Sequence, residues 1–204
     1  MGQYWMVVNL DKREYVCPHK VGAGLKLWEQ LAAHPGTGAA LVVLCAAMPE
    51  QRGGGDFNFD DTPEGYAAIA ERTIGRWAGN RIALVGDYAE RGDLPRDDDA
   101  DLIYHLCGTA TDRESSAAHW AKCDWTSNAK EQRKYKNKAR RLRKAAPFTD
   151  VSDDVAAVLE HELYGKYTGD GWRSWTGTLE EPAIRPDLVL VGPPRRAKGA
   201  AEGA

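Results

Sequence analysis

The sequence predicts an α+β fold, with a single domain over residues 1–193 and a disordered tail over 194–204. Three observations favour this class. Two β-rich runs flank a short polar turn near the N-terminus, strand-like and helix-like segments then follow one another without a βαβ rhythm, and residues 130–144 are strongly basic with helical periodicity. With 204 residues, 43% of them hydrophobic and 28% charged, the chain is large enough for one globular core.

An N-terminal hairpin and a helix are predicted first. Residues 4–10 (YWMVVNL) and 13–18 (REYVCP) are β-rich and lie on either side of Asp11 and Lys12, which is the pattern of a hairpin. Residues 25–33 (LKLWEQLAA) are predicted to form a helix that ends before a Pro-Gly pair. The apolar face of this helix consists of Leu25, Leu27, Trp28 and Leu31.

The middle of the chain contains three further strand patterns and a short helix. The continuous apolar run Ala40–Cys45 predicts a buried strand, with Cys45 as a small core residue. A short helix is expected to begin near Pro63. Residues 81–88 (RIALVGDY) are the clearest strand pattern in the chain, and Asp101–Leu106 is the pattern of another short strand.

A helix and a strand are predicted near the C-terminus. Ser152 is expected to cap a helix over 153–167. Asp153 and Asp154 lie in the first turn of this helix, where their negative charges interact favourably with the helix dipole. Residues 187–192 (DLVLVG) follow a proline and predict a final strand. Together these segments predict a mixed sheet of about five or six short strands, with several helices around it.

The basic segment is predicted to be a helix within a helical insertion at 107–147. Asn128 is a suitable N-cap with Glu131 three residues later, and Pro147 follows the segment. Its apolar stripe consists of Tyr135, Ala139, Leu142 and Ala146. The nine cations that cover the remaining surface are Lys130, Arg133, Lys134, Lys136, Lys138, Arg140, Arg141, Arg143 and Lys144.

Two interpretations of this helix stay open. A wide cationic surface suits a phosphate backbone or an acidic protein surface, and without a recognisable binding motif it implies no sequence-specific readout. The protein is then a small accessory or interaction protein that contacts nucleic acid. Alternatively, the protein is a structural module whose basic helix is latched onto its own acidic loops. Residues 50–101 contain thirteen acidic and six basic residues, a net charge of −7, whereas residues 130–144 contain nine basic and one acidic residue, a net charge of +8.

Two His and two Cys residues lie within residues 105–123, and they are candidate zinc ligands. His105 and Cys107 would share one face of a strand, and His119 and Cys123 would share one face of a helix. Zinc requires four such ligands in tetrahedral geometry. Against zinc, paired Cys-x-x-Cys motifs are absent from the sequence, so the alternative is that the four residues are close in sequence without forming a site. The sequence indicates no other cofactor.

A small enzyme is the remaining hypothesis, with a site near the end of the 81–86 strand. Arg81 can offer a planar guanidinium to a carboxylate or a phosphate, and Asp87 follows the strand where it leaves the core. His19 is the third candidate, because an imidazole can act as a general base. If the three side chains converge in one pocket, the enzyme hypothesis gains support.

Two stretches, residues 1–20 (MGQYWMVVNLDKREYVCPHK) and 77–90 (WAGNRIALVGDYAE), carry a resemblance to a known family. The chain resembles small uncharacterised proteins of bacteria, bacteriophages and fungi, and the resemblance covers residues 1 to about 90. Asn80 stands where the family has Asp, so no acidic role is implied there. The family implies no activity, cofactor or partner.

The chain is expected to be cytoplasmic and to have no membrane partner. Its N-terminal apolar stretch is short and is not preceded by basic residues. The longest strongly apolar run, Ala39–Met48, is too short to span a bilayer as a helix. The four cysteines are scattered, which is typical of a reducing compartment. No oligomeric state follows from the sequence.

Overall fold

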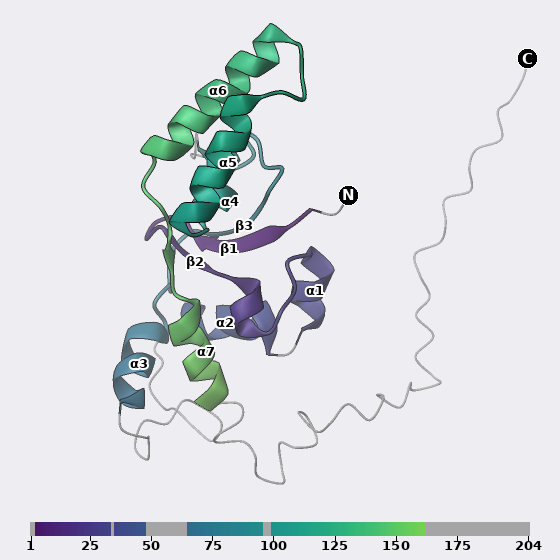
Figure 1. Ribbon diagram of the computed structural model, residues 1–204. Helices are drawn as coiled ribbons and strands as arrows, with labels where there is room; N and C mark the ends of the chain where they lie inside the picture. The colour runs from purple at the N-terminus through teal and green to yellow at the C-terminus, as the bar shows by residue number, and fades with distance from the viewer. Residues whose placement is uncertain (1–2, 34, 48–64, 96–98, 162–204) are drawn as a thin grey trace, which may run out of the picture. The chain divides into compact units, whose positions relative to one another are not determined.

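The computed structural model describes residues 3–33, 35–47, 65–95 and 99–161 (Figure 1). All of these belong to one compact unit. The strand predicted at 187–192 and the tail predicted at 194–204 therefore lie outside the described residues. Within the described ranges, no helix combines the length and the apolar character needed to cross a membrane.

A four-stranded mixed sheet lies at the centre of this unit, with strand order β3-β1-β2-β4. β1 (Trp5–Asn9) is antiparallel to both β2 (Glu14–Val16) and β3 (Ile82–Gly86), and β4 (Thr149–Asp150) runs parallel to β2 at the edge. The segments nearest the N-terminus thus hold the centre of the sheet.

The sheet is covered by helices on both faces, because the side chains of β1 alternate between two cores. Val7 pairs with Val16 and packs in the first core, whereas Val8 pairs with Tyr15 and packs in the second. The first core is on the side of η1 (Pro18–Val21), α1 (Leu27–Ala32), α2 (Gly36–Cys45), α3 (Tyr66–Thr73) and α7 (Ser152–Leu159) (Figure 1). The second is covered by α4 (Ala100–Leu106), α5 (Ala110–Lys122) and α6 (Ala129–Lys144).

The α+β class is confirmed, but the predicted strands are only partly present. The N-terminal hairpin forms, although its second strand is short and the chain turns into η1 at Pro18. The strand predicted at 81–88 is present as β3. The described residues contain four strands rather than five or six.

Two predicted strands, Ala40–Cys45 and Asp101–Leu106, are helices, so both predictions were wrong. A run of six apolar residues has no clear period, and it fits a buried helix as well as a strand. The first run belongs to α2, which begins directly after Pro35, and the second belongs to α4, whose first turn contains Asp101. Both helices pack their apolar side chains onto the sheet.

Two predictions of burial were also wrong. Cys45 is exposed at the end of α2. Two residues of the apolar face predicted for α1 point outward, with Trp28 79% and Leu31 68% exposed, whereas Leu25 and Leu27 are partly buried. The buried residue of α1 is Gln30, whose side-chain amide donates to the backbone carbonyls of Trp5 and Leu25. A polar side chain therefore attaches this helix to the sheet.

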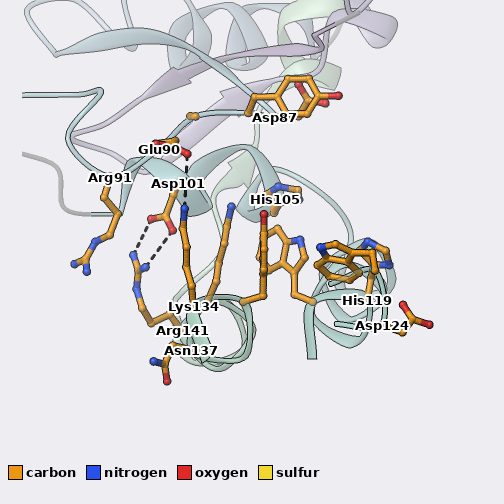
Figure 2. Close-up of a pocket in the computed structure, with 16 residues that line it drawn as sticks. Asp87, Glu90, Arg91, Asp101, His105, His119, Asp124, Lys134, Asn137 and Arg141 are labelled. Atoms are coloured by element: carbon orange, nitrogen blue, oxygen red, sulfur yellow. Dashed lines mark hydrogen bonds and ion pairs between the residues drawn. The ribbon is translucent and has the colours of Figure 1, made fainter. Parts of the chain in front are cut away.

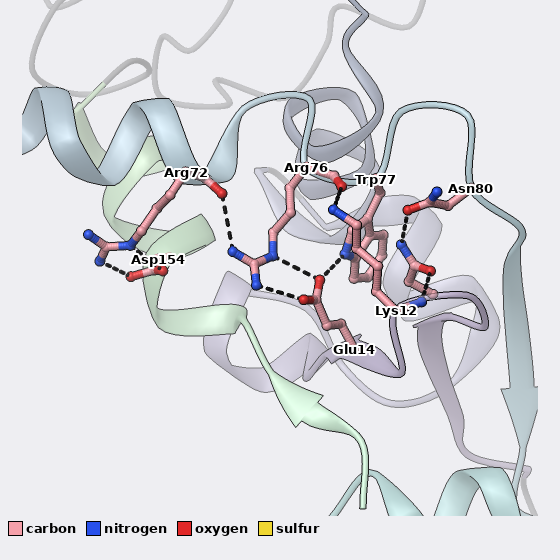
Figure 3. Close-up of polar contacts among 8 residues, drawn as sticks. Lys12, Glu14, Arg72, Arg76, Trp77, Asn80 and Asp154 are labelled. Atoms are coloured by element: carbon pink, nitrogen blue, oxygen red, sulfur yellow. Dashed lines mark hydrogen bonds and ion pairs between the residues drawn. The ribbon is translucent and has the colours of Figure 1, made fainter.

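A buried carboxylate joins the hairpin to the segment after α3 (Figure 3). Glu14 is 6% exposed and accepts two hydrogen bonds from the Arg76 guanidinium, at 2.6 and 2.8 Å, and one from the Trp77 indole N–H at 2.8 Å. Burial raises the pKa of Glu14, but the bonds from Arg76 and Trp77 outweigh it, so the pKa lies below its ordinary value. The carboxylate is therefore ionised and fully bonded at neutral pH.

A second contact connects the same two segments. The Asn9 side-chain oxygen accepts from the backbone N–H groups of Asp11 and Lys12, which closes the hairpin turn. The Asn9 amide also donates to the side-chain oxygen of Asn80 at 2.9 Å. Residues 1–20 and 77–90 are thus in direct contact in the fold.

Glu14→Gln is expected to lower the free energy of unfolding at pH 7 by about 2 to 3 kcal/mol, because it leaves a part-buried Arg76 without its counter-charge. Urea denaturation measures the loss. Since the pKa of Glu14 is lowered by folding, its stabilisation is complete above the ordinary carboxyl pKa and is lost as pH falls through the lowered value. The difference between wild type and variant should therefore shrink in acid.

The matched control is Asp11→Asn, which removes the exposed ion pair with Arg81 at the same hairpin. This variant should lower the free energy of unfolding much less than Glu14→Gln does, because solvent screens exposed ion pairs. Equal losses in the two variants would contradict a special role for Glu14.

Candidate nucleic-acid interface

The basic segment forms α6, as predicted. The Asn128 side-chain oxygen caps its N-terminus and accepts from the backbone N–H groups of Lys130 and Glu131. The Glu131 carboxylate bonds the Thr126 hydroxyl at 2.6 Å instead of returning to the Asn128 backbone. Ala139 and Leu142 are buried and Tyr135 is partly buried, whereas Ala146 lies beyond the helix and is exposed. The apolar stripe is therefore narrower than predicted.

Four of the nine cations hold α6 onto the rest of the protein, and we call them the anchoring cations. The Arg141 guanidinium lies 2.5 Å from an Asp99 oxygen and 2.8 Å from an Asp101 oxygen, and both acids belong to the start of α4. The other three contacts are Arg143 with Glu114 at 2.6 Å, Lys134 with Glu90 at 3.7 Å, and the Lys138 ammonium 4.2 Å from the centre of the Trp120 ring.

The other five cations share one face of α6, and we call this face the cationic ridge. Its members are Lys130, Arg133, Lys136, Arg140 and Lys144, at spacings of three, three, four and four residues. At about 100° per residue they occupy an arc of about 120°. All five are exposed, and none forms an ion pair with another residue of the described ranges. The ridge therefore presents five uncompensated charges to solvent.

A pocket of about 970 Å³ lies between the segment after β3 and the α5–α6 pair (Figure 2). Asp87 and Glu90 come from the β3 side, and Lys134 extends from α6 toward Glu90. The charged lining is balanced: it contains the four carboxylates of Asp87, Glu90, Asp101 and Asp124 and the four cations Arg91, Lys134, Lys138 and Arg141.

Aromatic side chains form much of the pocket wall. The His119 and Trp125 rings are stacked, with centroids 4.5 Å apart and an interplanar angle of 17°, and Tyr135 meets Trp125 edge-on at 5.1 Å. Trp125 is 44% exposed, and Tyr88, which also lines the pocket, is 56% exposed. These two rings offer accessible flat surfaces within the same pocket.

Partial burial shifts the pKa values of two groups that line the pocket, His105 and Lys138. Burial, together with the nearby Lys138 charge, lowers the pKa of His105 to about 4, and a backbone hydrogen bond with Asp87 and the Asp101 charge only partly oppose this shift. Burial also lowers the pKa of Lys138, against the attraction of Asp101. At neutral pH the His105 imidazole is therefore uncharged, with its Nδ1 atom 3.3 Å from the Ser116 hydroxyl.

The structure does not bring the three catalytic candidates together. Arg81 and Asp87 flank opposite ends of β3, six residues or about 20 Å apart. Arg81 pairs with Asp11 at 2.7 Å, and His19 is exposed on η1, which packs with the helices of the first core. Asp87 is the one candidate that lines the pocket, where its carboxylate also accepts from the Tyr4 backbone N–H.

The four candidate zinc ligands have separate surroundings. His105 faces Ser116, and His119 stacks on Trp125. Cys107 is buried in the second core, and the Cys123 thiol lies 3.9 Å from the Gln132 carbonyl oxygen. Among the residues that the structure describes, no group of three or more His, Cys, Asp or Glu side chains is placed to hold a metal ion.

Sequence reasoning missed Tyr88 and Trp125. Both lie in short connections, Tyr88 two residues after the end of β3 and Trp125 between α5 and α6. Aromatic residues close to a basic run are a signal of nucleic-acid contact. The sequence does not show that these two rings, 37 positions apart, line one pocket.

No protein-family model, no curated protein and no solved structure matches the chain.

The His105→Gln variant is expected to reduce the pH dependence of stability. The unfolded chain protonates His105 near pH 6.5 and the folded protein near pH 4, so the unfolded state binds more protons between these values. Stability therefore falls as pH decreases through this window, by up to about 3 kcal/mol from this group. Urea unfolding of wild type and variant across the window measures the difference. A difference that does not change with pH would contradict a buried, neutral His105.

Chelator-free protein is expected to contain much less than one zinc ion per chain, because Cys107 is buried among apolar side chains and His119 is stacked on Trp125. Elemental analysis of wild type and of Cys107→Ser with His119→Ala provides the measurement. Near-stoichiometric zinc that is lost in the double variant would establish the metal site instead.

Proposed function

We propose that the protein is a small accessory protein that binds nucleic acid without sequence specificity, through the cationic ridge of α6. The observation that carries the proposal is the division of the nine cations. Four make contacts within the protein, and the ridge of five has no internal partner in the described residues. The latch interpretation accounts for the four anchoring cations and not for the five residues of the cationic ridge.

The dimensions of the ridge fit a phosphate backbone. From Lys130 to Lys144 the helix rises about 21 Å, at about 1.5 Å per residue. One strand of a duplex advances about 3.4 Å per phosphate along its axis, so this length spans roughly six phosphates. Each phosphate that a Lys or Arg neutralises releases counterions, which supplies the binding free energy.

We also infer a cytoplasmic location for this activity. The four cysteines, all of them free, support a reducing compartment.

The test is a ridge variant in which Arg133, Lys136, Arg140 and Lys144 are replaced by Gln. The wild type is expected to bind DNA or RNA of unrelated sequences with similar affinity. Its affinity should fall with salt along a log–log slope of up to about −4.5, from about −0.9 for each of five contacts on duplex DNA. The ridge variant should lower the magnitude of this slope by about 3.6, because four contacts are lost. Anisotropy titrations at several salt concentrations measure the slopes.

A control variant removes the same charge elsewhere, by replacing Lys20, Lys26, Arg72 and Arg81 with Gln. Each of these side chains is exposed and lies outside α6. The control should keep the wild-type slope. No binding by the wild type at low salt, or equal slopes for all three proteins, would refute the proposal.

A further inference from the structure

The pocket beside the ridge has no role in backbone binding. We infer that it receives an unstacked nucleobase, so that single-stranded nucleic acid is the preferred ligand of this surface. The inference rests on the proposed function, because the ridge is needed to hold the sugar-phosphate chain to which the base is attached.

The ridge and the pocket adjoin along α6. Asn137 lines the pocket, and on the helix it lies between Arg133 and Arg140 of the ridge, four residues after the first and three before the second. Side chains at these spacings are neighbours on a helix surface. A backbone bound along the ridge therefore passes the edge of the pocket.

The charge of the pocket argues against a phosphate and for a neutral group. Its lining contains as many carboxylates as Lys and Arg cations. Three of the four carboxylates have cationic partners: Glu90 has Lys134, Asp101 has Arg141, and Asp124 has Lys122. A phosphate would meet the negative Asp87 there without a net positive field, whereas a neutral heterocycle avoids that cost.

The pocket offers both the surfaces and the polar groups that a base uses. His119 covers one face of the Trp125 ring, and the ring remains 44% exposed. Tyr88 contributes an accessible ring from the segment after β3. Bases stack on such rings with little sequence preference, and the Asn137 amide and the Asp87 carboxylate supply donors and acceptors for a base edge.

The volume fits a base together with its sugar. About 970 Å³ lies at the upper end of the range for pockets that hold small molecules. A base in a duplex cannot reach the pocket unless it leaves its stack, which is costly. Duplexes are therefore limited to the ridge, while single strands can use ridge and pocket together.

The experiment compares a single strand of about 12 nucleotides, within the usual site size for such surfaces, with the duplex of the same sequence. Binding is measured by anisotropy at one salt concentration for wild type, Trp125→Ala, Tyr88→Ala and the ridge variant. The matched control is Trp28→Ala, which removes a 79% exposed ring on α1. Thermal melts confirm that each variant is folded.

The wild type is expected to bind the single strand more tightly than the duplex. Trp125→Ala and Tyr88→Ala should each weaken single-strand binding about tenfold and leave duplex binding unchanged, because each removes one stacking surface. Trp28→Ala should change neither. The ridge variant should bind both the single strand and the duplex more weakly than the wild type does.

Two results separate the inference from the proposed function. If the ridge variant weakens both ligands but the two pocket variants bind the single strand as the wild type does, the base-binding inference is wrong and the proposed function stands. If the wild type binds neither ligand, or the ridge variant binds both as tightly as the wild type, the proposed function fails and the inference fails with it.

Discussion

The orientation of α6 depends on Arg141, whose guanidinium bonds Asp99 and Asp101 at the start of α4. Only Ala139 and Leu142 of α6 are buried, and so narrow a stripe does little to fix how the helix is rotated about its axis. Arg141 sets that rotation on one side, and Arg143 with Glu114 sets it on the other. Asp101 is largely buried, so loss of Arg141 would leave its charge uncompensated. Because the rotation of α6 is fixed, the cationic ridge faces solvent and the adjoining side of the helix lines the pocket.

The latch and the nucleic-acid surface were alternatives at the level of sequence. The structure shows ion pairs of the latch type at Lys134, Arg141 and Arg143, and the nucleic-acid surface that we propose uses other residues of the same helix. Within the part of the chain that the structure describes, the acidic side chains that pair with α6 are Glu90, Asp99, Asp101 and Glu114, and they lie beside two flanks of the helix. They compensate Arg141, Arg143 and Lys134, and no acidic residue of the described ranges pairs with the ridge. The net charges of +8 on residues 130–144 and −7 on residues 50–101 do not reveal which cations are paired, because the pairing depends on which acidic side chains reach the helix.

Local signals predicted the parts of the fold that local physics determines. Asn128 caps α6 as expected, and the polar turn at Asp11 joins two antiparallel strands. The run Ala40–Cys45 was misassigned because six consecutive apolar residues have no period, and its helical state depends on the surrounding chain. For the candidate site, too, the sequence predicted individual residues but not how the fold brings them together. The ridge residues were among the nine cations and Asp87 was a candidate, but the pocket brings together Asp87, Trp125 and α6 through the fold alone.

The division of the cations is tested most directly by acylating lysines with and without a single-stranded oligonucleotide and locating the modified residues by mass spectrometry. In the free protein, the exposed ridge lysines Lys130, Lys136 and Lys144 should react readily. The oligonucleotide should protect the three ridge lysines and leave the exposed Lys26 on the other side of the sheet unchanged. No protection of the ridge lysines, or equal protection of Lys26, would contradict the account.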